Sequence, residues 1–150
     1  MLRRRFAREL SGLAARPAQD FLSDPHTALA AVLLFDQVPR NLYRGRARAY
    51  GFDPLARAIA IGALERGWDA PLGLPQRQFL AMPLMHSEQI ADQRRSLAIY
   101  TGLGPRHGRP FAVSHHRMIA RFGRFPHRNE ALGRQSTAAE KRAVAAGFSW

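Results

Sequence analysis

The apolar residues of this chain recur at three- and four-residue spacing between proline and glycine breaks, a pattern that limits it to a helical fold. Leu2, Phe6, Leu10 and Leu13 line one face of a helix that stops before Pro17. Similar runs follow along the sequence, and no stretch alternates apolar and polar residues between turn pairs as strands do. We therefore predict an all-α fold of six to seven helices that pair as antiparallel helical hairpins.

Capping residues mark several helix starts. Asp24-Pro25 and Asp53-Pro54 each place an acceptor side chain before a proline in the first helical turn, so both aspartates should cap a helix. Ser87 is expected to cap the helix that follows it. Thr137 and Glu140 match the capping box, in which two side chains satisfy the first amides of a helix reciprocally.

The composition excludes some kinds of site and favours others. The 150-residue chain has no cysteine, which rules out disulfides, thiolate metal sites and a cysteine nucleophile. Its formal net charge is +12, and because Lys141 is the only lysine, nearly all the positive groups are guanidiniums. Guanidinium groups suit phosphate and carboxylate partners. The overall charge also predicts non-specific attraction to nucleic acid.

No segment has the pattern of a membrane span or a secretory signal. The longest apolar run, Ala28 to Phe35, is far shorter than the roughly 17–25 residues that cross a bilayer. The basic start of the chain lacks the continuous apolar stretch of a signal peptide. We therefore expect a cytoplasmic protein with no membrane partner.

Two proline segments stand out because each follows an apolar helical run and carries polar side chains. One is Asp36 to Asn41, which contains Pro39-Arg40-Asn41, and the other is Arg121 to Asn129. Proline fixes its own φ and pushes the preceding residue out of the helical region, so each segment should be a rigid elbow. Rigid elbows that carry polar groups are typical of binding sites.

The first elbow pairs a carboxylate with a guanidinium. Asp36 lies in the last turn of its predicted helix, where a negative charge opposes the helix dipole and needs a cationic partner. Arg40 is the expected partner. We favour a salt bridge that locks the elbow over the alternative, an acid or base that the arginine orients.

Histidines supply the other candidate reactive groups. His86 is expected to be a partly buried, satisfied histidine, or alternatively a hydrogen bonder or proton carrier that faces a cleft, while Glu88 gains from the dipole of the helix it should begin. His116 is expected to lie closer to the second elbow than His115, since neighbours in a helix point about 100° apart. His86, Glu88, His116 and His127 are zinc-ligand types without a recognised ligand spacing, so we predict no metal and no cofactor.

The second elbow is predicted to present a concave cationic surface made by Arg121, Arg124, Arg128 and Asn129. Arg121 and Arg124 are three residues apart, which places them side by side if the helix continues that far. Phe122 and Phe125 are expected to anchor the elbow in the core rather than to stack on a ligand.

Several motifs in a fixed order carry a family resemblance: Leu34 to Gly45, Leu84 to Glu88, Ala91 to Gln93, His116 to Ile119, Arg121 to Asn129, Leu132 to Arg134, and Ser136-Thr137. They resemble the bacterial domain-of-unknown-function 924 family. The resemblance implies an all-helical fold similar to tetratricopeptide-like hairpins, and no established activity. The family's polar positions correspond here to Asp36, Gln37, Arg40, Asn41, His86, Ser87, Glu88, Asp92, His116, Arg121, Arg124, His127, Arg128 and Asn129.

The resemblance also sets the expected organisation of the chain. It runs from about Phe21 to the end, so residues 1–20 form an N-terminal helical segment poorly matched to the family, and residues 21–150 form a single helical domain. Family members usually begin with an aromatic-rich segment that carries a Trp-Phe pair, which residues 1–20 lack. This shortened start implies an open or incomplete site, a homodimer in which a second copy covers it, or an abbreviated gene model.

Three functions fit these residues, in order of preference. The first is binding of an anionic small molecule or acidic peptide in a groove lined by Arg40, Asn41, Arg121, Arg124, His127, Arg128 and Asn129. The second is hydrolysis, in which His86 or His116 acts as general base and Glu88 or Asp36 orients it. The third is charge-driven nucleic-acid binding, ranked last because basic residues are not interleaved with aromatics on a strand platform.

Overall fold

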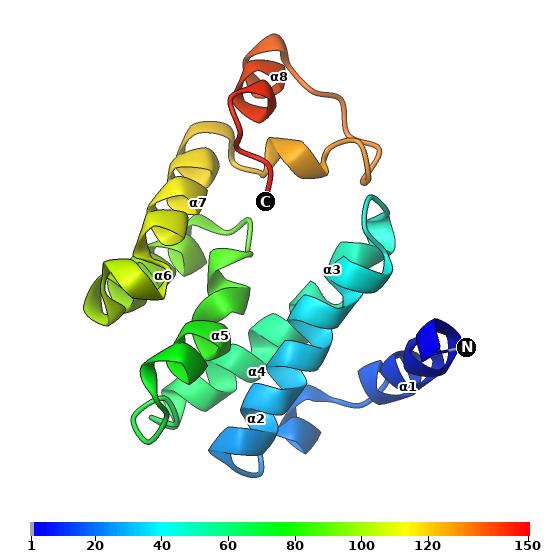
Figure 1. Ribbon diagram of the computed structural model, residues 1–150, viewed down its shortest axis with the longest axis vertical. Helices are drawn as coiled ribbons and strands as arrows, with labels where there is room; N and C mark the ends of the chain where they lie inside the picture. Colours follow the sequence, from blue (N-terminus) through cyan, green and yellow to red (C-terminus); the bar gives the residue numbers. More distant parts are fainter. Residues whose placement is uncertain (1) are drawn as a thin grey trace. The chain divides into compact units, whose positions relative to one another are not determined.

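The computed structural model describes residues 2–150, with side chains from Arg4 onward, and every regular element in that range is helical (Figure 1). The α-helices are α1 (Leu2–Ala14), α2 (Pro25–Val32), α3 (Val38–Leu42), α4 (Asp53–Glu65), α5 (Leu74–Met85), α6 (Ile90–Leu103), α7 (Arg109–Phe122) and α8 (Ala138–Ala145). The 3-10 helices are η1 (Ala18–Phe21), η3 (Ala47–Tyr50), η4 (Pro105–His107) and η5 (Pro126–Arg128), and η2 (Leu33–Gln37) is a π-helix. Because α2, η2 and α3 are continuous, the described residues form 7 helices, which confirms the all-α prediction.

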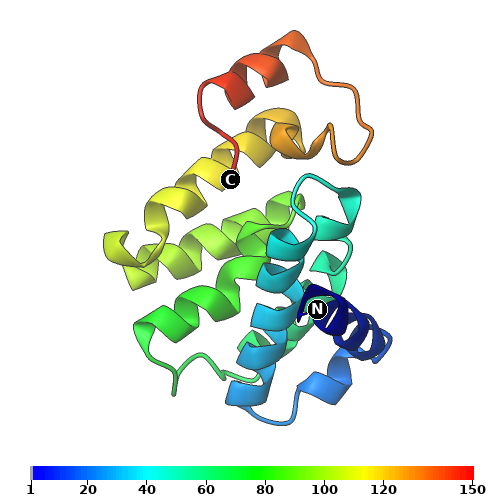
Figure 2. The ribbon, with the colours of Figure 1, turned by 45° about the vertical axis from the view of Figure 1, so that its right-hand side comes forward.

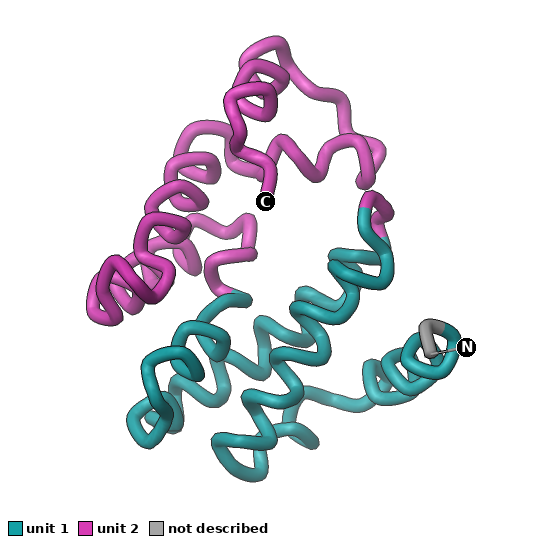
Figure 3. The backbone as a smooth tube through the Cα atoms, viewed as in Figure 1, with its two compact units in different colours: residues 1–44, 48–83 teal, residues 45–47, 84–150 magenta. Residues whose placement is uncertain are grey.

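The chain divides into two compact units (Figure 3). Unit 1 consists of the chain up to Arg44 together with residues 48–83, and unit 2 consists of residues 45–47 and 84–150. The division falls inside the range 21–150, for which one domain remains a prediction. None of the helices within residues 2–150 is long and apolar enough to cross a membrane.

Unit 1 is built around the helix that runs from α2 through η2 into α3. Its core packs α2 and η2 against α4, with η1 alongside. The ring of Phe35, which is fully buried, meets the edge of Phe21 at 5.2 Å between centroids and stacks on Phe52 at 6.4 Å. Gly62 on α4 leaves room for the Leu22 side chain, because a Cβ at that position would lie 2.6 Å from a Leu22 methyl carbon.

Unit 2 is built around the pair α6 and α7, which lie side by side (Figure 2). A short connection through η4 joins them, as expected for a helical hairpin. A second cluster of buried residues contains Met118, Ile119, Phe125 and Ala143, with Phe122 packed against it. The prediction that Phe122 and Phe125 anchor the second elbow in the core is therefore confirmed.

Two of the predicted caps form as expected. Asp24 accepts hydrogen bonds from the Thr27 hydroxyl at 2.6 Å and the Thr27 amide at 2.9 Å, and these two bonds, in that order, lower the pKa of Asp24 to about 2. Thr137 and Glu140 form the full capping box, with 2.8 Å from Thr137 N to Glu140 Oε2 and 3.2 Å from Glu140 N to Thr137 Oγ1.

The other two predicted caps are wrong. The residue at the N-cap of α4 is Phe52, so Asp53 is already inside the helix, and its carboxylate turns to Arg40 instead. The N-cap of α6 is Gln89, and Ser87 lies two residues earlier. The Ser87 hydroxyl donates to the Asp92 carboxylate at 2.6 Å, so both side chains have charged partners that the local pattern did not indicate.

Candidate functional site

The first predicted elbow is not an elbow. The chain passes through Pro39 as one continuous helix, because the π-helix η2 immediately precedes it. The amide of Val38 donates to the Leu33 carbonyl five residues back, which widens this turn of the helix. The wider turn accommodates a proline that has no N–H and that would crowd the preceding turn of a regular helix. The segment is therefore rigid but straight.

Arg40 is the centre of a carboxylate cluster in unit 1. Its two terminal nitrogens donate to Asp53 at 2.8 and 2.9 Å in a bidentate pair, and Nη1 lies 3.4 Å from Asp36 Oδ1. Burial opposes the charge of Arg40, but Asp36 and Asp53 outweigh it and raise the Arg40 pKa above its usual value. The salt-bridge interpretation of Asp36 and Arg40 is thus confirmed, with Asp53 as an additional partner that the sequence did not indicate.

Asn41 lies on the exposed side of the same helix. Its amide donates to the Gln37 carbonyl at 3.2 Å, one turn back. Asp36, Arg40 and Asn41 all belong to unit 1, whereas the other predicted site residues belong to unit 2. Their convergence on one groove remains a prediction.

The second elbow forms as predicted. Helix α7 ends at Phe122, and Gly123 adopts a φ of 69°, the left-handed conformation that favours glycine at a helix end. The chain then extends through Phe125 into η5. Because the helix stops before Arg124, the expected side-by-side arrangement of Arg121 and Arg124 is wrong. Arg121 stays exposed, with its guanidinium 4.8 Å from the Phe122 ring centre.

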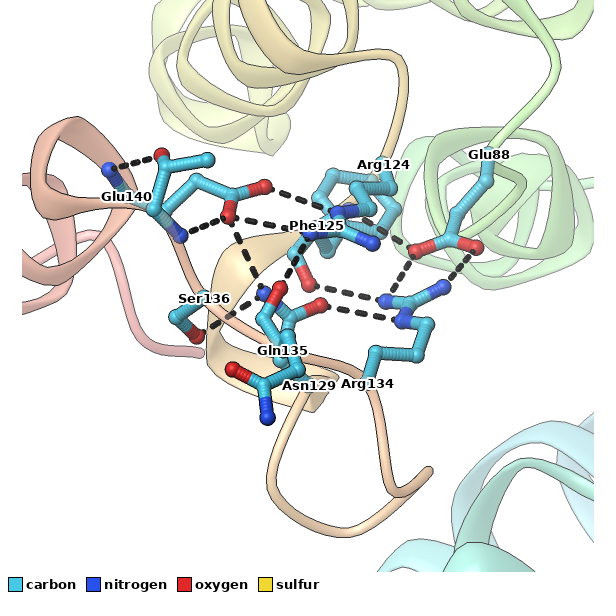
Figure 4. A network of polar contacts seen from close by, with 9 residues as sticks. Glu88, Arg124, Phe125, Asn129, Arg134, Gln135, Ser136 and Glu140 are labelled. Carbon is cyan, nitrogen blue, oxygen red and sulfur yellow. Dashed lines mark hydrogen bonds and ion pairs between the residues drawn. The ribbon is translucent and has the colours of Figure 1, made fainter.

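Arg124 is paired within the protein (Figure 4). Its guanidinium donates to both carboxylate oxygens of Glu140, at 2.7 and 3.0 Å, and to the Gln135 carbonyl at 2.6 Å. The hydrogen bond from Arg124, followed by that from the Thr137 amide, lowers the pKa of Glu140 to about 2. Glu140 therefore serves both as the capping-box residue of α8 and as the counter-ion of Arg124.

A second ion pair holds the opposite side of the elbow (Figure 4). Arg134 donates to both oxygens of Glu88 at 2.9 Å, and the Phe125 amide donates to Glu88 at 2.8 Å. Burial alone would raise the Glu88 pKa, but these hydrogen bonds outweigh it and leave the pKa below its usual value. Arg134 also donates to the Asn129 side chain at 2.9 Å.

These contacts change the predicted roles of two residues. Glu88 precedes α6 rather than lying in its first turn, and both of its oxygens accept from unit 2 donors. Asn129 is 1% exposed and donates to Ser136 Oγ at 3.0 Å, so it braces the loop after η5. Local sequence patterns did not point to Arg134, although it lies in one of the motifs that carry the family resemblance.

The loop that carries His86 is held along its backbone. The buried amide of Gln93 donates to the carbonyls of Met85 and Ser87, each at 2.7 Å, and Arg128 donates to the His86 carbonyl at 2.9 Å. These three successive carbonyls are thus bound by two side chains, one from α6 and one from η5. The His86 side chain is therefore presented on a fixed loop.

Two imidazoles contact the Phe125 ring and a third contacts one of them, and we call His86, His115 and His127 the imidazole cluster. The ring of His115 is 5.9 Å from that of His86 and 5.3 Å from that of Phe125, between centroids. His127 lies 5.8 Å from Phe125. The Arg128 guanidinium sits 4.6 Å from the centre of the same phenyl ring.

His115, and not His116, is the helix α7 histidine in this cluster. It is 3% exposed, and burial, followed by the charge of His86, lowers its pKa to about 3. The prediction that His116 lies closer to the elbow is wrong. The spacing contained a signal for His115, which precedes the apolar residues Met118, Ile119 and Phe122 by three, four and seven positions and so shares their face.

The cluster is not arranged as a metal site. Within the part of the chain that the structure describes, no three His, Cys, Asp or Glu side chains come together in a way that could hold a metal ion. Unit 2 holds twelve Lys or Arg against four Asp or Glu, a net charge of +8 out of +12 for the chain.

Comparison with known proteins agrees with this fold. A solved structure of a protein of unknown function from Agrobacterium tumefaciens is 38% identical, covers 95% of this chain and 81% of its own, and superposes with a TM-score of 0.88. No curated protein matches the sequence. The sequence model of a bacterial family described as a protein of unknown function, DUF924, matches residues 1–147. Because that match spans nearly the whole sequence, the chain belongs to the DUF924 family of bacterial proteins.

Proposed function

We propose that unit 2 binds a small anionic group, a carboxylate or a phosphoryl group, at the imidazole cluster. The observation that carries the proposal is that His86, His115 and His127 come from three separate segments and form one cluster, in which His115 and His127 contact Phe125 and His86 contacts His115. Imidazole N–H groups donate hydrogen bonds to anion oxygens, a role that the proposal gives to His86 and His127, because His115 Nδ1–H already donates to the Phe111 carbonyl. Their surroundings in unit 2 carry a net charge of +8, which attracts anions.

Two arginines of the second elbow are already paired with carboxylates of the protein, which favours the imidazole cluster as the anion site. Arg124 and Arg134 are each bound in a bidentate way by a carboxylate of the protein, so they brace the elbow and do not require an external anion. Arg128 is 6% exposed and fixed between the His86 carbonyl and the Phe125 ring. Its charge lies beside the cluster, where it adds to the local positive potential.

The test is an NMR titration with inorganic phosphate, following the ring protons of all 6 histidines at constant pH and ionic strength. We expect the signals of His86 and His127 to shift in a saturable way and the signal of His26, in unit 1, to stay constant. His127→Ala should weaken binding about tenfold, the loss of one charge-assisted hydrogen bond. His116→Ala is the matched control and should bind as the wild type does. Equal shifts at all histidines, or none, would refute the proposal.

A second candidate is polyanion binding by the outer surfaces of α6 and α7. Exposed arginines lie on both helices, at Arg94, Arg95, Arg109, Arg117 and Arg121. Binding of this kind should weaken with salt, with a log–log slope of about −0.9 for each duplex phosphate neutralised. An Arg117→Ala, Arg121→Ala double variant should reduce that slope by about 2. Affinity for duplex DNA that does not change with salt would exclude this candidate.

Of the four residues predicted to catalyse hydrolysis, His86 is the one that belongs to the imidazole cluster. Glu88 is bound by Arg134 and the Phe125 amide, and Asp36 belongs to the Arg40 cluster of unit 1. Binding therefore ranks above catalysis.

A further inference from the structure

The tail that follows α8 places an aromatic ring against the imidazole cluster. The Trp150 ring stacks on His115, with 3.8 Å between centroids and 24° between planes. Phe125, His127 and Phe148 meet the same indole nearly at right angles, at 80°, 87° and 73°. One stacked and three perpendicular neighbours are the arrangements that aromatic pairs favour.

His115 and Phe125 are fixed by parts of unit 2 outside the tail, whereas Trp150 is more exposed. Phe125 is fully buried in the core and His115 is 3% exposed. His115 Nδ1 is also fixed, at 2.7 Å from the Phe111 carbonyl within its own helix. Trp150 is 39% exposed and lies three residues beyond Gly147, whose φ of 100° sets the course of the tail. The indole can therefore leave without moving His115 or Phe125.

We infer that His115, Phe125, His127 and Phe148, which we call the ring cage, bind the planar aromatic group of an anionic ligand, a position that Trp150 occupies in the free protein. The indole in the structure shows what fits: a flat ring stacked on a neutral imidazole. The anionic substituent rests on the proposed function, because His86 lies 5.9 Å from His115 and Arg128 4.6 Å from Phe125 at the border of the cage. An aromatic carboxylate or an aromatic phosphate ester combines both features.

The tail then acts as an intramolecular competitor. A tethered group competes at an effective concentration of the order of mM. If the tail fills the cage in about nine-tenths of the molecules, its removal strengthens ligand binding about tenfold. The test measures, by isothermal titration calorimetry, binding of indole-3-acetate, indole and acetate to the wild type and to Trp150→Ala. We expect indole-3-acetate to bind most tightly, indole more weakly and acetate most weakly, with the first two tighter for Trp150→Ala. His115→Ala in the Trp150→Ala background should abolish the advantage of the ring.

The three probes separate failure of the ring cage from failure of the anion site. If indole-3-acetate binds no better than acetate, the ring cage is refuted while the anion site stands. If indole binds as well as indole-3-acetate, the ring cage stands and the anion site is refuted. Equal affinity of indole-3-acetate for the wild type and Trp150→Ala would overturn the competition by Trp150.

A second measurement covers the case in which Trp150→Ala does not fold. In Trp68→Phe, which removes the other tryptophan of the chain, all indole fluorescence comes from Trp150. Added benzoate, which does not fluoresce in that range, should shift the emission to longer wavelength as Trp150 moves into water. Acetate at the same concentration is the control. Unchanged emission at saturating benzoate would contradict the inference.

Discussion

Glu140 offers the sharpest test of how the second elbow is held. The change is Glu140→Gln, which keeps the size of the side chain and removes its charge. Glu140 is 3% exposed and accepts from Arg124 at 2.7 and 3.0 Å and from the Thr137 amide at 2.8 Å. Glutamine has an NH₂ group in place of one carboxylate oxygen. Either the Arg124 guanidinium or the Thr137 amide would then face this NH₂ group instead of an acceptor.

The expected cost follows from these contacts. Hydrogen bonds to a charged group contribute about 1.5–3 kcal/mol each, and removing one partner of a buried ion pair costs about 3–5 kcal/mol. Arg124 is 30% exposed, so water replaces part of what it loses. We therefore expect Glu140→Gln to lower the free energy of unfolding by about 2–3 kcal/mol.

Urea denaturation followed by circular dichroism measures this loss at pH 7. The matched control is Glu130→Gln, an exposed glutamate of the same unit that should cost less than about 0.5 kcal/mol. The pKa of Glu140 falls from 4.5 to about 2 on folding, so its stabilisation is full above pH 4.5 and lost as pH falls towards 2. Glu140→Gln should lack this part of the acid loss. Equal stabilities of the two variants at pH 7 would refute the reasoning.

Three other predictions concern buried polar groups. Asp53→Asn should lower the free energy of unfolding by about 1–2 kcal/mol in urea denaturation, because Asp53, with 20% of its side chain exposed, forms a bidentate pair with Arg40. The control Asp20→Asn should cost less than about 0.5 kcal/mol, because the Asp20 side chain is 38% exposed in its pair with Arg16. Ser96→Ala should leave stability unchanged or raise it by up to about 1 kcal/mol, since its buried hydroxyl has no hydrogen-bond partner among the described residues; a clear loss would show an unseen partner. The pKa of His115 is lowered from 6.5 to about 3, so between these values His115 is protonated in the unfolded chain but neutral in the native state. The free energy of unfolding therefore falls as pH drops from 6.5 towards 3. His115→Gln should flatten this decline between pH 7 and 5, and His116→Gln should not.

Local patterns in the sequence were enough to predict the helical fold and some of its boundaries. The spacing of apolar residues predicted the helices, and Gly123 and the Thr137–Glu140 box marked two of their ends. Each of these features depends on residues within one or two turns of each other. The element that failed, the elbow at Pro39, depends on a π-helical turn for which the spacing of apolar residues gives no separate signal.

The candidate site was less predictable, because its main contacts join distant residues. Glu88 and Arg134 are 46 positions apart, and Arg124 and Glu140 are 16 apart. Local reasoning gave Glu88 and Glu140 helix-end roles and could not detect that each carboxylate also neutralises an arginine. The choice of His116 over His115 was avoidable, since the apolar positions of α7 already placed His115 on the buried face.

The π-helix η2 gives unit 1 an unusual dependence on the length of its longest helix. Deleting Leu34 would tighten this turn to ordinary α-helical winding. Pro39 would then collide with the carbonyl four residues before it, at a cost of about 3 kcal/mol or more. The continuous helix of α2, η2 and α3 would then bend at Pro39, and Arg40 would move away from Asp36 and Asp53. A deletion that restores regular α-helical geometry would therefore break the Arg40 cluster.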